Sequence, residues 1–316
     1  MPSNENCPYI CPASTSPMLS ICIPVFNYDV RPLVRDLHCQ AFSLNAPAEI
    51  LILDDASDLE YQIINRELLE LEGVKYEELS LNAGRSRIRN LLTKKARFPW
   101  IIFMDCDSAT PDEHYLKRYL DETDEISVVC GGRTYLPEPP HDNTYLHWLY
   151  GNRREVRNAA KRSVNPHLSF MTNNFMIPKS ILQRIPFNEN IKGYGHEDTL
   201  LGYELMKNKV PVKHIDNPLL HIGLQDNRDF LDKSREGVKN LAFINNYLDN
   251  GADLAKMVRL LKAYRILRRF GLCGPFASTF EWIRKPLEAN LMGKKPKLQY
   301  FDLYKLGYFC LNRHQA

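Results

Sequence analysis

The sequence predicts an α/β protein built on a mostly parallel sheet flanked by helices, followed by a helical C-terminal appendage. Apolar runs of strand length alternate with helix-period segments from residue 19 to about residue 222. Two of the strand-like runs end in pairs of acidic residues, and after Gly223 only helical patterns remain. Strands that alternate with helices favour parallel pairing through right-handed crossovers.

The strands are expected where short apolar runs lie between turn residues. Their ranges are 19–26, 49–53, 74–79, 100–104, 126–132, 174–178 and 212–215. Helices are expected between the early strands, at 59–71 and 84–96. In the second of these, Ile88, Leu91 and Leu92 share one face.

Composition places the chain among ordinary globular proteins. Of its 316 residues, 44% are hydrophobic and 25% are charged. No apolar stretch approaches the roughly 18 residues of a membrane span. Residues 1–17 carry four prolines and no basic residue before their short apolar stretch, so a disordered leader is expected rather than a signal peptide. The eight cysteines are scattered; Cys7 and Cys11 have a metal-like gap without a second pair, which favours reduced thiols and a cytoplasmic protein.

The C-terminal part is helical and basic. Helices are expected at 228–248 and 254–270, followed by a Gly/Pro-marked stretch and short polar and basic segments. Between residues 256 and 297, eleven Lys or Arg face only two acids. The predicted organisation is a leader at 1–17, a main domain at 18–225 and a helical extension at 226–316.

Acidic residues end two predicted strands. Asp54 and Asp55 follow the second strand, and Asp105 and Asp107 follow the fourth. A solvated turn is one explanation, since Asp is a common turn residue. In an open α/β sheet, however, ligands bind beyond the carboxyl ends of the strands, and both pairs should meet there. This coincidence favours a ligand site.

The segment "MDCDS" carries an Asp-x-Asp pattern. Residues two apart in an extended segment point to the same side, so Asp105 and Asp107 could share one cation. Oxygen ligands suit Mg²⁺ or Mn²⁺, which takes further ligands from water and substrate phosphates.

Three further segments suggest catalytic or ligand-binding groups. "GYGHEDTLLGYEL" places Glu197 and Asp198 at a predicted helix start, where acids are favoured by the helix dipole and a carboxylate is well held as a general base. His221 ends an apolar run, where a packed core residue and a metal ligand are both consistent with the pattern. "LNAGRSRIRN" is a Gly turn and helix start with Arg85, Arg87 and Arg89, which favours a nearby phosphate; a solvated basic face accounts for Arg87.

Together these motifs resemble the family 2 glycosyltransferases of the GT-A fold. "SICIPVFNYD", "LILDDASD", "LNAGRSRIRN", "IIFMDCDS" and "GYGHEDTLLGYEL" follow the family's order and spacing over residues 18 to 223. The family's usual "DDGS" is "DDAS" here.

The resemblance implies a role for each matching residue. The implied nucleotide-binding residues are Pro24, Phe26, Asn27, Asp54, Asp55, Arg85 and Asp105. The implied metal-binding residues are Asp107, Asp105 and His221. Asp198, with Glu197 beside it, matches the family's catalytic base.

The implied activity is an inverting, Mn²⁺- or Mg²⁺-dependent transfer of a hexosyl or N-acetylhexosaminyl group. The donor would be a nucleotide sugar with UDP as the default, and the acceptor a glycan or lipid-linked glycan. A sugar nucleotidyltransferase and a catalytically inactive nucleotide-sugar-binding protein are the alternatives. No P-loop motif is present, and no nucleic-acid partner is expected.

Two segments allow more than one interpretation. Residues 141–166 mix aromatic and basic side chains, consistent with acceptor binding or with a mobile lid. In the basic extension, apolar residues beside Lys and Arg fit either packing on the main domain or peripheral binding to an anionic membrane, at the inner face of a cell membrane.

Overall fold

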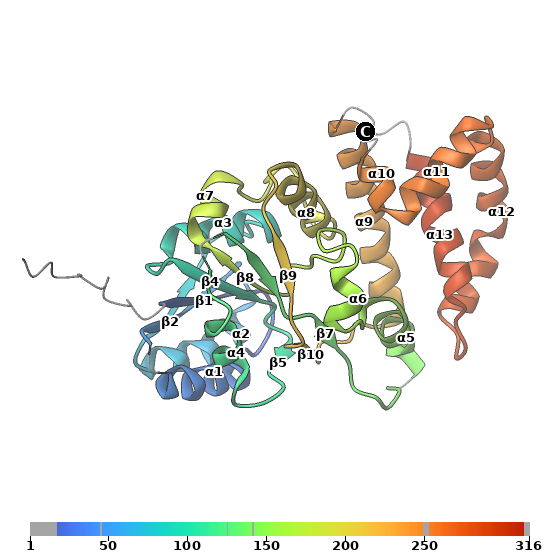
Figure 1. Ribbon diagram of the computed structural model, residues 1–316. Coiled ribbons are helices and arrows are strands. Elements are labelled where there is room, and N and C mark those ends of the chain that lie inside the picture. The colour runs from blue at the N-terminus through green and yellow to red at the C-terminus, as the bar shows by residue number, and fades with distance from the viewer. Residues whose placement is uncertain (1–17, 45, 125, 141, 249–252, 313–316) are drawn as a thin grey trace, which may run out of the picture.

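A seven-stranded sheet forms the centre of the structure (Figure 1). The computed structural model describes residues 18–44, 46–124, 126–140, 142–248 and 253–312. The strand order is β3-β2-β1-β4-β8-β6-β9. The strands are β1 (Leu19–Val25), β2 (Ala48–Asp54), β3 (Val74–Glu78), β4 (Trp100–Met104), β6 (Val128–Cys130), β8 (Asn174–Pro178) and β9 (Val212–His214).

The sheet is mostly parallel, as predicted. Strands β3, β2, β1 and β4 run parallel, β8 pairs antiparallel with both β4 and β6, and β9 is parallel to β6. β1, β2 and β4 are almost continuously apolar because helices cover both faces of the sheet. The carboxyl ends of β1, β2 and β4 therefore open at one edge, where the predicted acids lie.

The helices around the sheet are short. They are α1 (Arg31–Ser43), α2 (Leu59–Asn65), the 3₁₀ helix η1 (Arg66–Glu70), α3 (Arg85–Lys95), α4 (Tyr115–Leu120), α7 (Lys179–Arg184) and α8 (Glu197–Lys207). The predicted helix at 59–71 is thus an α-helix that continues as 3₁₀. One apolar layer joins α1 and α4 to the sheet, and a second joins α3, α7 and α8 to its other face.

A second, three-stranded sheet lies beside the acidic strand ends. It consists of β5 (Ser108–Ala109), β10 (Leu219–His221) and β7 (Arg133–Thr134), in the order β5-β10-β7. The register places His221 opposite Ser108. This short sheet was not predicted, since two- and three-residue strands leave no periodic pattern, yet it sets the position of His221.

Residues 142–163 pack between the sheet and the C-terminal helices. They form η2 (Asp142–Thr144), α5 (Tyr145–Tyr150), a π-helical turn η3 (Gly151–Glu155) and α6 (Ala159–Ser163). Tyr150 packs on Phe230 and Phe301, and Arg154 forms a 2.8 Å ion pair with Asp302. Several aromatic and basic side chains of this segment therefore join it to the C-terminal helices.

Five helices make up the C-terminal region: α9 (Asn227–Tyr247), α10 (Leu254–Met257), α11 (Arg259–Arg269), α12 (Cys273–Leu291) and α13 (Leu298–Leu311). Helix α9 lies between the sheet region and the remaining helices (Figure 1). The predicted helix at 254–270 is interrupted at Val258, whose backbone is extended. None of the helices in the described ranges has the length and apolar character that a bilayer span requires.

The expectation of short polar segments after residue 272 was wrong. Instead, α12 and α13 pack side by side along most of their length. The prediction was wrong because it took the Gly and Pro residues as signs of a break in helical structure. Pro275 lies in the first turn of α12, where no backbone N–H is needed. Pro286 lies inside the helix, and burial of Phe280, Leu287 and Leu291 offsets the hydrogen bond that it removes.

The apolar residues of the basic extension are divided between core and surface. Leu261, Tyr264 and Phe280 are buried among the C-terminal helices, as in the packing interpretation. Phe270 and Trp282 remain 68% and 87% exposed. The predicted leader, including Cys7 and Cys11, lies outside the described residues, and the six cysteines within them are free.

Candidate functional site

The loops after β1 and β2 are fastened to each other. The Asn27 side chain accepts a hydrogen bond from the backbone N–H of Asp58 (2.8 Å) and donates one to its carboxylate (2.9 Å). The Ser57 hydroxyl accepts from the Asn27 backbone N–H (2.8 Å), and Asn27 has a φ of 48°. Beside this junction Phe26 is exposed and Pro24 half-buried at the carboxyl end of β1. The three residues predicted on the first strand therefore lie together at the open edge of the sheet.

Asp54 and Asp55 face different partners, which is how adjacent carboxylates coexist. Buried Asp54 accepts hydrogen bonds from the Ser57 backbone N–H (2.7 Å) and the Tyr76 hydroxyl (2.8 Å), so it fixes the turn after β2. Asp55 accepts from the backbone N–H groups of Ala83 and Gly84, just before α3. Burial, aided by the Asp54 charge, raises the pKa of Asp55 in spite of these bonds.

Arg85 and Arg89 link α3 to α8 through ion pairs with Glu197. They lie one turn apart on the same face of α3. Arg85 reaches the Glu197 carboxylate at 3.3 Å and Arg89 reaches it at 3.8 Å, while Arg89 also donates to Asp105 at 2.9 Å. Burial acts to raise the pKa of Glu197, but the two guanidinium groups outweigh it and hold that pKa below its ordinary value. Glu197 is thus an ionised, buried anchor.

Asp105 has a second cationic partner on β7. Arg133 lies 3.3 Å from Asp105 and 3.3 Å from Glu155, whose carboxylate also accepts a 2.5 Å hydrogen bond from the Tyr135 hydroxyl. Glu155 ends the π-helical turn that starts at Gly151. A side chain on Gly151 would lie 2.2 Å from the Tyr135 ring, so glycine permits this close approach.

Asp107 and His221 form a separate pair. The residues from Asp105 to Asp107 make a turn between β4 and β5 rather than an extended run, and the two carboxylates have different neighbours. His221 Nδ1 lies 3.4 Å from Asp107 Oδ1. Gly223 packs against Asp107: a Cβ there would lie 2.6 Å from that of Asp107. Burial acts to raise the pKa of Asp107, but His221 and the nearby Arg133 and Arg85 lower it to about 2.

This pair fits a divalent cation. Asp107 Oδ1 and both ring nitrogens of His221 are buried and have no hydrogen-bond partner among the described residues, which is costly unless a ligand satisfies them. A carboxylate oxygen and an imidazole nitrogen both suit Mn²⁺. Within the described ranges no three His, Cys, Asp or Glu side chains converge as a complete metal site. Asp107 and His221 would supply two ligands, and Mn²⁺ or Mg²⁺ takes further ligands from water and substrate phosphate.

Asp198 begins α8 behind a loop with unusual backbone geometry. Gly193, Gly195 and His196 have φ values of 67°, 92° and 69°. Asp198 Oδ1 accepts a 2.6 Å hydrogen bond from the Thr199 backbone N–H. Burial, followed by the charge of Glu197, raises the pKa of Asp198 to about 7. A carboxyl group with this pKa suits a general base at neutral pH.

Helix α9 holds that loop in place. The Asn240 side-chain amide donates to the carbonyl oxygens of Lys192, Tyr194 and Gly195 at 2.8, 3.0 and 3.2 Å. A Cβ on Gly195 would lie 3.2 Å from the Gly237 Cα, which shows how closely the loop packs on the helix. The C-terminal region thus supports the loop that presents Glu197 and Asp198.

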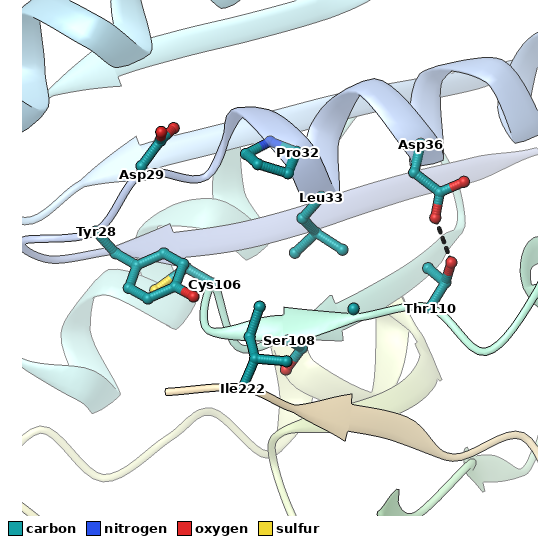
Figure 2. A pocket seen from close by; sticks show the side chains of 10 residues that line it. Tyr28, Asp29, Pro32, Leu33, Asp36, Cys106, Ser108, Thr110 and Ile222 are labelled. Carbon is teal, nitrogen blue, oxygen red and sulfur yellow. Dashed lines mark hydrogen bonds between the residues drawn. The ribbon is translucent and has the colours of Figure 1, made fainter. Parts of the chain in front are cut away.

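A pocket of about 200 Å³ lies next to the Asp105–Asp107 turn (Figure 2). Tyr28, Asp29 and Leu33 line it on the α1 side, facing Cys106 and Ile222. None of the predicted site residues lines this pocket, although Cys106 and Ile222 are direct neighbours of Asp107 and His221 in the chain.

The structure thus brings five of the eleven predicted site residues into two groups. Arg85, Glu197 and Asp105 form one ion-paired network, and Asp107 and His221 form a pair of their own. Sequence reasoning placed Arg89 near a phosphate and missed its burial and its ion pairs, and it assigned no role to Arg133, Glu155 or Asn240. For Arg89 a signal existed: it shares the apolar face of α3 with Ile88 and Leu92, where a solvated arginine would not be placed.

Comparisons with known proteins agree with this geometry. The profile of the family described as "Glycosyl transferase family 2" matches residues 20–186, more than half of the chain. No curated protein matches the sequence.

Among solved structures, mannosyltransferase PcManGT from Pyrobaculum calidifontis, in complex with GDP-Man and Mn²⁺, is 13% identical with a TM-score of 0.58. The match covers 95% of this chain and 88% of that one. S. aureus TarS matches at 18% identity with a TM-score of 0.49, over 73% of this chain and 43% of that one. Its 1–349 fragment matches at 17% identity with a TM-score of 0.49, over 94% of this chain and 91% of that one. The chain therefore spans less than half of full-length TarS. The PcManGT match shows the fold, a GT-A architecture.

Proposed function

The chain belongs to glycosyl transferase family 2 and is a glycosyltransferase, and we propose that it takes a hexosyl or N-acetylhexosaminyl group from a UDP-sugar. The acceptor is a hydroxyl group of a glycan or lipid-linked glycan, and the transfer is a single displacement with inversion. The observation that carries the proposal is Asp198: a half-buried carboxyl with a pKa of about 7, at a fixed helix start beside the arginine-linked acids.

Asp198 is the proposed base. The acceptor oxygen forms a bond to the anomeric carbon while the bond from that carbon to the phosphate oxygen breaks. The acceptor proton passes to Asp198, and the electron pair of the broken bond leaves with the nucleoside diphosphate. General-base help of this kind contributes about 10²–10⁴-fold. Glu197 does not compete for the proton, because Arg85 and Arg89 keep it ionised and paired.

Asp107 and His221 would hold Mn²⁺ or Mg²⁺, with Asp105 behind them. When bound, the cation neutralises charge on the departing diphosphate. Asp105 is held by Arg89 and Arg133, which leaves it oriented as a nucleotide contact rather than as a free metal ligand.

The remaining donor contacts are proposed at the edge of the sheet. Pro24, Phe26 and Asn27 offer exposed surface to the nucleotide, and Asp55 lies beneath the Ala83–Gly84 turn that approaches it. Asp54 contributes to the donor site indirectly, because it fixes the turn after β2.

A nucleotide-sugar panel tests the proposal. The purified protein is incubated with UDP- and GDP-sugars, with and without Mn²⁺, and release of nucleoside diphosphate is followed. A glycosyltransferase releases UDP or GDP in a metal-dependent manner. A sugar nucleotidyltransferase instead releases pyrophosphate from a nucleoside triphosphate and a sugar phosphate. An inactive binding protein binds the nucleotide sugar without turnover.

We also propose a peripheral contact between the C-terminal extension and an anionic membrane. Ile266, Phe270, Leu272 and Trp282 are exposed, and exposed Arg269 and Lys285 lie in the same helices or beside them. Apolar side chains next to cations suit an anionic bilayer surface. Such a contact, and a cytoplasmic location, would suit a lipid-linked acceptor. The division into 1–17, 18–225 and 226–316 stays a prediction.

A further inference from the structure

Helix α9 presents a lysine toward the candidate site. Lys233 Nζ lies 5.7 Å from the centre of the Tyr194 ring, and the Arg85 guanidinium carbon lies 4.5 Å from the centre of the same ring. Tyr194 belongs to the loop that leads to Asp198. One aromatic ring therefore brings together a cation from α3, next to Glu197, and a cation from the C-terminal helical region.

Lys233 differs from the other cations of the site in having no carboxylate partner. Arg85 is paired with Glu197, Arg89 with Asp105 and Glu197, and Arg133 with Asp105 and Glu155. No carboxylate within the described parts of the chain lies within ion-pair distance of Lys233. Glu236, one turn further along the same helix, packs on Gly193, where an added Cβ would lie 1.7 Å from its carboxylate oxygen.

The surroundings of Lys233 make the charged state costly without a ligand. The side chain is half-buried. Burial lowers the pKa of Lys233, and the Arg85 charge lowers it further, while Asp229, Asp107 and Glu236 act in the opposite direction. A half-buried ammonium that faces another cation is stabilised when an anion arrives between them.

We propose that Lys233 is a phosphate-binding residue of the donor site, contacting the diphosphate of the nucleotide sugar opposite Arg85. This rests on the proposed function. Arg85, at the turn expected to approach the donor, shares the Tyr194 ring with Lys233. The charge of Asp107, expected to hold the cation, also acts on Lys233. A phosphate that bridges Arg85 and the cation site would thus come within reach of the ammonium group.

The chemical role follows from the transfer step. As the bond between the anomeric carbon and the phosphate oxygen breaks, that oxygen gains the electron pair and its charge grows. A fixed ammonium group is a strong point charge for such an oxygen. Removal of one such stabilising group typically costs about 10²–10³-fold in kcat. The C-terminal helical region would then belong to the catalytic apparatus.

The test uses the full-length chain carrying Lys233→Met, with Lys239→Met as a matched control. Lys239 is an exposed lysine on the same helix. Binding of UDP with Mn²⁺, and of GDP as a second probe, is measured by calorimetry without any acceptor, and kcat and KM are measured with donor and acceptor varied. Thermal unfolding of each variant is measured in parallel.

For Lys233→Met we expect diphosphate binding weakened about tenfold, kcat reduced about 100-fold, and a melting temperature equal to or above that of the wild type. Lys233→Arg should recover part of the affinity, and Lys239→Met should match the wild type.

Unchanged diphosphate binding with a raised KM for the acceptor would mean that Lys233 meets an anionic acceptor, and the proposal would be wrong. A lowered melting temperature with normal kinetics would make Lys233 a structural residue. If the wild type binds neither diphosphate, the proposed function itself fails, and this inference with it.

Discussion

Replacing Asp198 by Asn separates chemistry from folding at this site. The Asn side chain has the same shape, and its oxygen can still accept the hydrogen bonds that Thr199 donates to Asp198. It cannot take a proton. We therefore expect kcat to fall by about 10²–10⁴-fold, the range typical of a lost general base. Donor binding should change little, because in the described residues Arg85 and Arg89 form their ion pairs with Glu197 and Asp105 and not with Asp198.

The pH profile gives the prediction a sharper form. With a pKa of about 7, roughly a tenth of the Asp198 carboxyl groups are ionised at pH 6 and roughly nine tenths at pH 8. Only the ionised group acts as a base, so the wild-type kcat should rise about tenfold across that interval. A carboxyl group with an ordinary pKa would give a flat profile there. The residual activity of Asp198→Asn should lose the dependence.

The stability of the fold should change with pH in the opposite direction to kcat. Because the folded state raises the pKa of Asp198 above its unfolded value, this group stabilises the fold at low pH, and the contribution is lost as pH rises from about 4 to about 7. Asp198→Asn should therefore unfold at the same or a higher temperature than the wild type at pH 8. A variant that loses donor affinity together with kcat, measured by calorimetry and initial rates, would refute the assignment of Asp198 as base.

Three further predictions concern the metal pair, the loop before α8 and the C-terminal extension. Asp107→Ala should abolish transfer and Mn²⁺-dependent UDP binding, and His221→Ala should do so less completely; normal rates for the Asp107 variant would make the metal assignment wrong. Asn240→Ala should lower kcat about tenfold with little change in donor KM, and Asn240→Asp should be at least as damaging because a carboxylate would face three carbonyl oxygens. The wild type should co-sediment with anionic vesicles at low salt and less at high salt. Replacing Phe270 and Trp282 by Ser should weaken this co-sedimentation. Equal recovery in the supernatant under all conditions would mean that the C-terminal extension does not bind membranes and only packs on the rest of the protein.

The sheet could be predicted because its signal is local. Every strand of the seven-stranded sheet was expected within a few residues of its observed bounds, since buried strands are short apolar runs between turn residues. The placement of Asp54, Asp55, Asp105 and Asp107 followed from that alone. Only the partners of these acids were out of reach, because partners depend on contacts between segments far apart in the chain.

The parts that could not be predicted are those set by distant contacts. Arg133 and Glu155 meet Asp105 through a two-residue strand and a π-helical turn, neither of which has a sequence period. Asn240 and Lys233 lie on a helix that sequence reasoning treated as an appendage. Their roles arise only because α9 packs against the loop before α8.

The ion pairs also explain how so many acids can share one edge of a sheet. Asp105 and Glu197 are each neutralised by two arginines, of which Arg89 is shared and buried, and Asp54 is satisfied by its own turn and Tyr76. Among the described residues, Asp107 keeps a buried oxygen without a hydrogen-bond donor, and the donors to Asp198 come from its neighbour Thr199. The acids thus divide into those that hold the framework and those left open to ligands. The two open carboxylates are the two expected to bind the cation and to take the acceptor proton, and the arginine-linked acids fix their separation.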